Sequence, residues 1–113
     1  MAKVVGFETL TVAAAAIGPT AATLQGATLF TSDTTVAPPR QKAANYALFG
    51  PLETAQVRWR DDGTAPTASV GHLLETGQVM EYDGDLNKIL FIRTGGTSGA
   101  LPVTYYARNK AVL

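Results

Sequence analysis

Hydrophobic and polar positions alternate along much of this chain with the two-residue period of β-strands. In residues 57–60, Val57 and Trp59 fall on one face and Arg58 and Arg60 on the other, as in a strand with one buried side. β-Branched and aromatic residues, which favour strands, recur in the same segments. The pattern predicts six strands, at residues 3–12, 21–31, 55–60, 78–82, 88–94 and 101–108.

The last two of these segments carry most of the predicted core. Residues 88–94 are apolar on both faces, with Ile89 and Phe91 opposite their neighbours, which favours a central strand covered on both sides. In residues 101–108, Pro102 lacks a backbone N–H and predicts a strand start or a sheet edge. The predicted core residues are Val57, Trp59, Ile89, Phe91, Val103 and Tyr105.

Glycine and proline interrupt the chain at strand-like intervals. With eleven glycines and six prolines, no window of helical length remains uninterrupted except residues 41–49. Asp61, Asp62 and Gly63 predict a turn after a strand, with Arg58 or Arg60 as the partner of an aspartate. Asp83 and Gly84 lie between two strand-like runs and predict a hairpin turn. Residues 94–99, TGGTSG, predict a flexible loop between the last two strands.

One segment, about residues 31–51, does not follow the strand pattern. Pro38 and Pro39 exclude a helix there and favour an extended arm, and the alanine-rich part that follows allows one or two helical turns. We interpret this segment as a long Pro/Ala-rich excursion from a compact core. The predicted fold is therefore all-β, an antiparallel β-sandwich or barrel with one excursion.

Length and charge narrow the classes of function. The chain has 113 residues, so we expect a single β domain over residues 1–113. Nine basic residues balance nine acidic ones, and no excess charge draws the protein to nucleic acid or to a membrane surface. Only 16% of residues are charged, which suits a protein that works inside an assembly. There are no cysteines, which excludes disulfide bonds and thiolate metal sites.

We do not expect the apolar stretch near the N-terminus, residues 12–17, to be a targeting segment. It is much shorter than the roughly 20 residues that cross a bilayer. Only Lys3 precedes it, and Glu8 interrupts the apolar positions, whereas a signal peptide has a basic start and a continuous apolar core. We expect the protein to be made in the cytoplasm.

Residues 57–74 gather the side chains that most resemble a catalytic or metal site. Asp61 and Asp62 would point to opposite faces of an extended chain, so they converge only if the backbone turns. His72 is the only histidine and has no cysteine to share a zinc ion with. We read Asp61 and Asp62 as turn residues and His72 as a turn or interface residue.

The remaining motifs also fail to form a reactive site. Ser32, Ser69 and Ser98 lack a nucleophile-elbow context, and no Gly-Lys-Ser/Thr follows the glycines of TGGTSG, as a phosphate loop requires. The sequence thus predicts no catalytic residues, no metal and no cofactor. Five aromatic residues could instead form a sugar-stacking platform, but core or subunit interface is the preferred interpretation: Tyr46, Trp59, Tyr82, Tyr105 and Tyr106.

The order of several motifs resembles a family of small structural proteins of tailed bacteriophages. The motifs are VRWRDDGTAPTASVGHLL, then GQVMEYDG, then ILFIRTGGTSGALPVTYYAR, with FETLTVAAAAIGPTAATL near the start. The resemblance covers about two thirds of the chain and implies an all-β virion component without catalysis. The stretch from Thr31 to Pro51 departs from the family pattern, being longer and richer in proline and alanine.

From this resemblance we expect a capsid decoration, or cement, protein of the virion. The expected partners are the major capsid protein or other virion proteins, and further copies of the chain, as a trimer, with neither nucleic acid nor a membrane. A tail, connector or fibre-base component is the first alternative, and a carbohydrate-binding module is the alternative of another class. The candidate interface residues are Pro38, Pro39, Arg40, Tyr46, Arg58 and Arg60.

Overall fold

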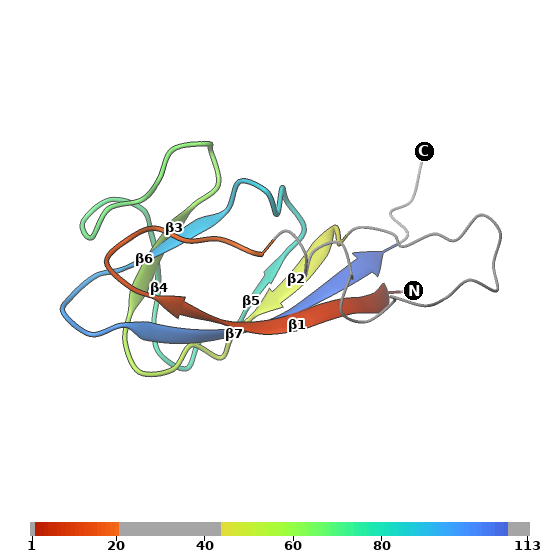
Figure 1. Ribbon diagram of the computed structural model, residues 1–113, viewed down its shortest axis with the longest axis horizontal. Coiled ribbons are helices and arrows are strands. Elements are labelled where there is room, and N and C mark those ends of the chain that lie inside the picture. Colours follow the sequence, from red (N-terminus) through yellow and green to blue (C-terminus); the bar gives the residue numbers. More distant parts are fainter. Residues whose placement is uncertain (1, 21–43, 109–113) are drawn as a thin grey trace, which may run out of the picture.

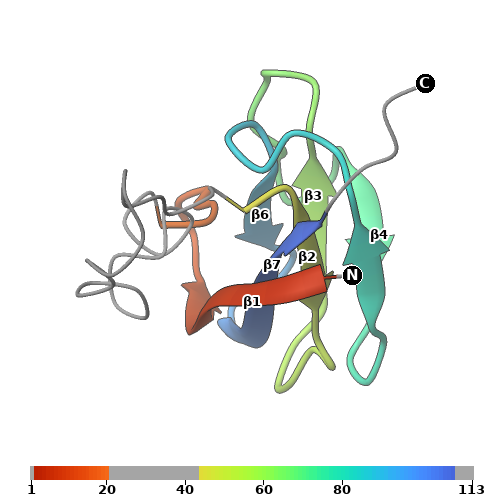
Figure 2. The ribbon, with the colours of Figure 1, turned by 90° about the vertical axis from the view of Figure 1, so that its right-hand side faces the viewer.

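The structure is a computed structural model that describes residues 2–20 and 44–108, and in these ranges the predicted all-β class is confirmed. Its strands form two antiparallel sheets packed as a β-sandwich, one with the order β1-β7-β2-β5 and one with the order β4-β3-β6 (Figures 1 and 2). The strands are β1 (Ala2–Val12), β2 (Tyr46–Phe49), β3 (Val57–Arg60), β4 (His72–Leu74), β5 (Met80–Tyr82), β6 (Leu90–Arg93) and β7 (Gly99–Arg108).

Some predictions lie outside the described residues. These are the strand at residues 21–31, the Pro-rich arm with Pro38, Pro39 and Arg40, and Ser32. No helix long and apolar enough to cross a membrane occurs in residues 2–20 or 44–108.

β1 and β7 form the longest pairing of the fold. Their register runs from Ala2 opposite Arg108 to Val12 opposite Gly99, with an irregularity between Val4 and Gly6. Alternate residues point between the two sheets, as the sequence pattern predicts, and their partners point outward. The buried side chains of this pair are Val5, Leu10, Val12, Leu101, Val103, Tyr105 and Ala107.

The prediction that Pro102 marks a strand start or an edge is wrong. Pro102 lies within β7, which has β1 on one side and β2 on the other. The carbonyl of Pro102 accepts a hydrogen bond from the backbone of Gly50, at 2.8 Å. The last pair between β2 and β7 is Phe49 with Val103, so the missing N–H of Pro102 falls where β2 has just ended. A central strand therefore tolerates this proline.

β2 corrects the interpretation of residues 31–51 as an excursion that ends in helical turns. Residues 46–49 form a strand between β7 and β5, with Ala47 and Phe49 fully buried. The alanine-rich composition favours a helix locally. Pairing with β5 and β7 and the burial of Phe49 outweigh that preference. The C-terminal part of the expected excursion thus belongs to the core.

In the three-stranded sheet, β3 is central and β6 lies at the edge, which corrects the prediction of residues 88–94 as the central strand. The outer edge of β6 is nevertheless covered by the chain that follows β1. Ile17 and Phe91 exchange two backbone hydrogen bonds, at 2.9 and 2.7 Å, and the N–H of Arg93 donates to Ala13. The apolar character of β6 reflects this extra neighbour and the sheet opposite.

Two local turn predictions are also corrected. His72 does not lie in a turn, because it begins β4 and is paired with Trp59 of β3. Asp83 and Gly84 do not close a hairpin, because β5 pairs with β2 while β6 pairs with β3 in the other sheet. A Cβ at Gly84 would instead clash with the ring and hydroxyl of Tyr82, so a larger residue there would force that side chain to shift. The loop at residues 94–99 does join β6 to β7, across the two sheets.

The core lies between the sheets and contains most of the residues that the sequence analysis assigned to it. Val57, Ile89, Phe91, Val103 and Tyr105 are fully or almost fully buried. Trp59 is half-buried and packs against the margin of this core rather than inside it. The rings of Phe49 and Phe91 lie 5.0 Å apart and join the two sheets.

Candidate functional site

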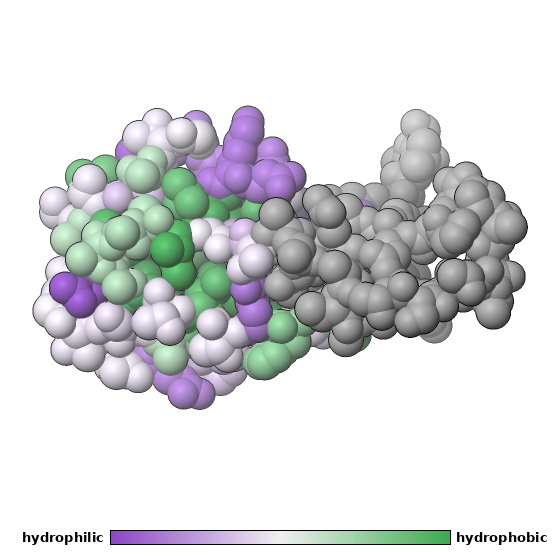
Figure 3. All heavy atoms as spheres, viewed as in Figure 1, coloured by the Kyte–Doolittle hydropathy of each residue, from purple (hydrophilic) through white to green (hydrophobic). Residues whose placement is uncertain are grey.

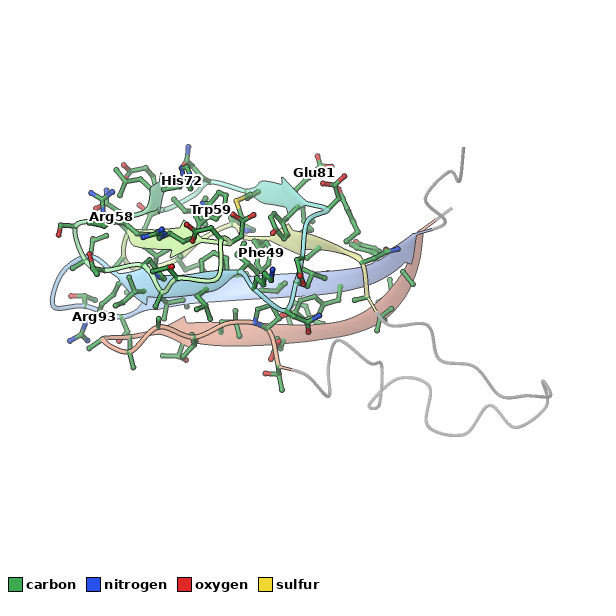
Figure 4. All side chains as sticks on the ribbon, turned by 90° about the horizontal axis from the view of Figure 1, so that it is seen from above. Phe49, Arg58, Trp59, His72, Glu81 and Arg93 are labelled. Atoms are coloured by element: carbon green, nitrogen blue, oxygen red, sulfur yellow. The ribbon has the colours of Figure 1, made fainter. Side chains whose placement is uncertain are left out.

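Trp59 and His72 form an aromatic pair on β3 and β4, at the margin of the core. The two rings are 4.6 Å apart, side by side on β3 and β4 (Figure 4). Tyr82 of β5 meets Trp59 edge-on at 6.2 Å and so links the pair to the other sheet. His72 is exposed, and in the described part of the chain no three metal-ligating side chains lie together. The pair is a packing contact between neighbouring strands.

Asp61 and Asp62 do not act as a pair of carboxylates. Asp61 accepts a hydrogen bond from the hydroxyl of Tyr82, at 2.7 Å, whereas Asp62 forms a salt bridge with Arg60, at 2.5 Å. Gly63, with φ of 89°, allows the bend that follows. The two carboxylates face different partners, so the geometry offers no shared proton or shared metal ion.

The salt bridge and the tyrosine contact each raise the pKa of the group that donates the hydrogen bond. The hydrogen bonds from Arg60 lower the pKa of Asp62, and those to Asp62 raise the pKa of Arg60. Burial raises the pKa of Tyr82, and the Asp61 carboxylate raises it further. At neutral pH the hydroxyl of Tyr82 therefore stays protonated and donates its hydrogen bond to Asp61.

Arg58 holds the long loop between β3 and β4 against the sheet. Its guanidinium donates to the carbonyl oxygens of Ala68, at 3.1 Å, and Gly71, at 2.8 Å. Of the two arginines expected to partner an aspartate, only Arg60 does so. Pro66, within the same loop, is buried. Arg58, a candidate interface residue, is engaged within its own chain.

A second tyrosine–carboxylate contact, which the sequence analysis missed, lies beside β1. The hydroxyl of the buried Tyr105 donates to Glu8 at 2.5 Å. The same carboxylate accepts from the backbone N–H and the hydroxyl of Thr20, at 2.9 and 2.6 Å. Burial, and then Glu8, raise the pKa of Tyr105. Because these residues are far apart in sequence, no local pattern could have paired them.

The serines have no arrangement for nucleophilic catalysis in the described residues. Ser98 accepts a long hydrogen bond from Arg93, at 3.4 Å, and Ser69 lies in the exposed tip of the loop after β3. His72 packs against the ring of Trp59.

The five predicted aromatic residues do not form one platform. Tyr105 is buried, and Trp59 and Tyr82 pack along the margin of the core. Tyr46 and Tyr106 lie side by side on the outer face of the four-stranded sheet, with rings 5.7 Å apart and tilted by 53°. The hydroxyl of Tyr46 donates to Glu81 of β5, apart from Trp59 and His72 in Figure 4.

Large apolar side chains are exposed at two places. Val4 and Phe7 lie on β1, and Phe7 is 61% exposed; Val70, Leu73 and Val79 lie around β4 and the loops beside it. Figure 3 views the side on which residues 13–20 leave β1, where apolar residues fill the middle and hydrophilic ones gather at the rim. The alternation in residues 3–12 could have identified Phe7 as the outward residue of its strand.

The site that the structure supports best is therefore a binding surface, the outward side of β1. It is defined by Val4, Phe7, Thr9 and Thr11. Comparisons with protein-family models, with curated proteins and with solved structures found no match for this chain.

Proposed function

We propose that the chain is a structural protein of a bacteriophage particle, a decoration or cement protein that binds the head and stabilises it. The structural observation that supports this proposal most is the outward side of β1. There the exposed apolar side chains of Val4 and Phe7 lie beside Thr9 and Thr11, and none of these four residues is charged. Exposed apolar patches mark surfaces that bind other proteins. The order of the sequence motifs supports the same class.

The described side chains favour binding over catalysis. Asp61, Asp62 and Glu8 each hold a structural contact. A surface that only binds can still hold a small neutral protein firmly on a particle, because many copies on a repeating lattice act together. The partners would be the major capsid protein or other virion proteins, and further copies of the chain.

The copy number per virion tests this proposal. We expect hundreds of copies in purified particles, measured by quantitative mass spectrometry against the major capsid protein. Particles stripped of the protein should lose thermal stability and regain it when the purified chain is added back. A copy number on the order of six or twelve, as symmetric tail assemblies contain, would assign the chain to the tail, connector or fibre base instead.

A carbohydrate-binding module is the second candidate, and one observation favours it. Tyr46 and Tyr106 are adjacent and face outward, as residues that stack on a sugar would. Glycan-array binding by the purified chain, abolished by Tyr106→Ala, would support the module and contradict the decoration protein.

A further inference from the structure

We infer that the outer edge of β1 pairs with β1 of a second copy of this chain, antiparallel and with Thr9 facing Thr9 across a two-fold axis. That this contact is used in a phage particle rests on the proposed function. The dimer itself does not, because we expect the purified chain to form it without a particle.

The hydrogen bonds of β7 establish which backbone groups of β1 face outward. Ala100 exchanges two backbone hydrogen bonds with Glu53, at 2.8 and 2.9 Å, on the side of β2. Successive residues of a strand direct their N–H and C=O groups to opposite sides, so Leu101 directs its own toward β1, where Leu10 is its partner. Thr9 and Thr11 therefore direct their N–H and C=O groups away from β7.

The same alternation extends to Phe7, which is opposite Thr104. Phe7, Thr9 and Thr11 are all exposed, and in residues 2–20 and 44–108 no strand other than β7 pairs with β1. A row of unpaired backbone groups along a strand edge is a template for another strand.

This edge lacks most of the features that protect natural sheet edges. Charged side chains, prolines and bulges usually prevent pairing at an edge. From Phe7 to Thr11 the one charged residue is Glu8, and its carboxylate is held by Tyr105 and Thr20. The irregularity of β1 lies between Val4 and Gly6, before this stretch. Among the described residues, nothing therefore occupies the outer edge of residues 7–11 as a strand partner.

A second copy of β1 fits this edge better than the opposite edge of the same sheet. β5, at that edge, is only Met80–Tyr82, so pairing β1 with β5 of the next copy would leave most of β1 unmatched. Two β1 strands related by a two-fold axis have equal lengths. Such an isologous contact also closes after two copies, whereas a head-to-tail contact continues.

The sequence of β1 is compatible with this register. With Thr9 on the axis, Phe7 of one copy lies opposite Thr11 of the other, and the outward N–H of each meets a C=O across the interface. None of these three side chains is charged, so no like charges meet. The exposed ring of Phe7 gains a neighbour, and the two four-stranded sheets become continuous.

The purified chain, without any particle, tests the inference by native mass spectrometry and analytical ultracentrifugation. The wild-type chain should be dimeric, and Thr9→Lys should raise the dimer dissociation constant about tenfold, since it places two like charges opposite each other. Thr97→Lys is the matched control, because Thr97 is an exposed threonine in the loop between β6 and β7 and does not lie on β1; it should leave the constant unchanged.

A charge-reversal mixture tests the register. Thr9→Lys and Thr9→Glu should each dimerise weakly alone and should form a mixed dimer when combined. Should either variant unfold, Thr9→Cys decides the matter: with no other cysteine in the chain, it should form a disulfide-linked dimer on mild oxidation, and Thr97→Cys should not.

A wild-type chain that stays monomeric, or a trimer unaffected by Thr9→Lys, would overturn the inference. If the chain dimerises as expected but is found in a phage tail, the proposed function is refuted and the inferred contact between β1 strands still holds.

Discussion

The two sheets present opposite kinds of outer face. On the three-stranded sheet, Arg58 and Arg60 point outward, and Arg58 binds the loop that folds back over the face. On the four-stranded sheet, Phe7 and Thr9 point outward from β1, and the edge beside them has no strand partner in the described residues. The same alternation therefore gives one outer face that a loop of the chain covers and one on which Phe7 and Thr9 are exposed within the described residues.

The largest expected effect comes from comparing two phenylalanines, Phe91 in the core and Phe7 at the surface. Phe91 is fully buried and packs on Phe49, so Phe91→Ala should lower the free energy of unfolding by about 3 to 5 kcal/mol. Phe7→Ala, at the outward side of β1, should change it by no more than about 0.5 kcal/mol in the monomer. Urea denaturation measures both. Equal losses would show that Phe7 supports the fold and is not a contact surface.

Arg58 provides the next comparison, within the three-stranded sheet. Arg58→Ala removes two hydrogen bonds that hold the loop between β3 and β4, and we expect a loss of about 1 to 3 kcal/mol. Hydrogen exchange should show faster opening of the backbone near Gly71. Arg60→Ala removes only an exposed salt bridge and is the matched control, with a smaller loss. If the two variants behaved alike, the loop would not depend on Arg58.

The smallest effect is expected from the tyrosine contact beside β1. Tyr105→Phe should cost about 1 kcal/mol at neutral pH, because Glu8 loses one hydrogen-bond donor while Thr20 remains. The pKa of Tyr105 is raised in the folded protein, so the folded state holds this proton more tightly than the unfolded chain does.

The stability that this proton contributes is fully present below the unfolded tyrosine pKa of about 10 and is lost as the pH rises beyond it. Tyr82 acts in the same direction. Urea unfolding of the wild-type protein between about pH 8 and pH 11 should therefore show a decline above about pH 10. The decline should be shallower in Tyr105→Phe, and an identical slope would show that Glu8 does not depend on this tyrosine.

Several strands and one turn could be predicted because their signals are local. Alternation in residues 3–12, 55–60 and 101–108 identified strands and most of the buried side chains within them. β2 and β4 were missed, because the four residues of β2, at the end of an alanine-rich stretch, and the three residues of β4 carry too little pattern to stand out. Both become strands through the neighbours with which they pair.

The sequence by itself determined the class of this protein: strands in place of helices, a neutral charge balance and a bend after Asp62, each a property of neighbouring residues and backbone sterics. Only the tertiary structure decided which strands pair, why Pro102 is tolerated in a central strand, and that Glu8 meets Tyr105. The alternation along a strand specifies which of its side chains point inward. It does not specify which strand pairs with it, because the backbone of any strand can supply the same hydrogen bonds. The position of β1 at the edge of its sheet, with β7 as its one strand partner in residues 2–20 and 44–108, is a consequence of that choice of neighbours.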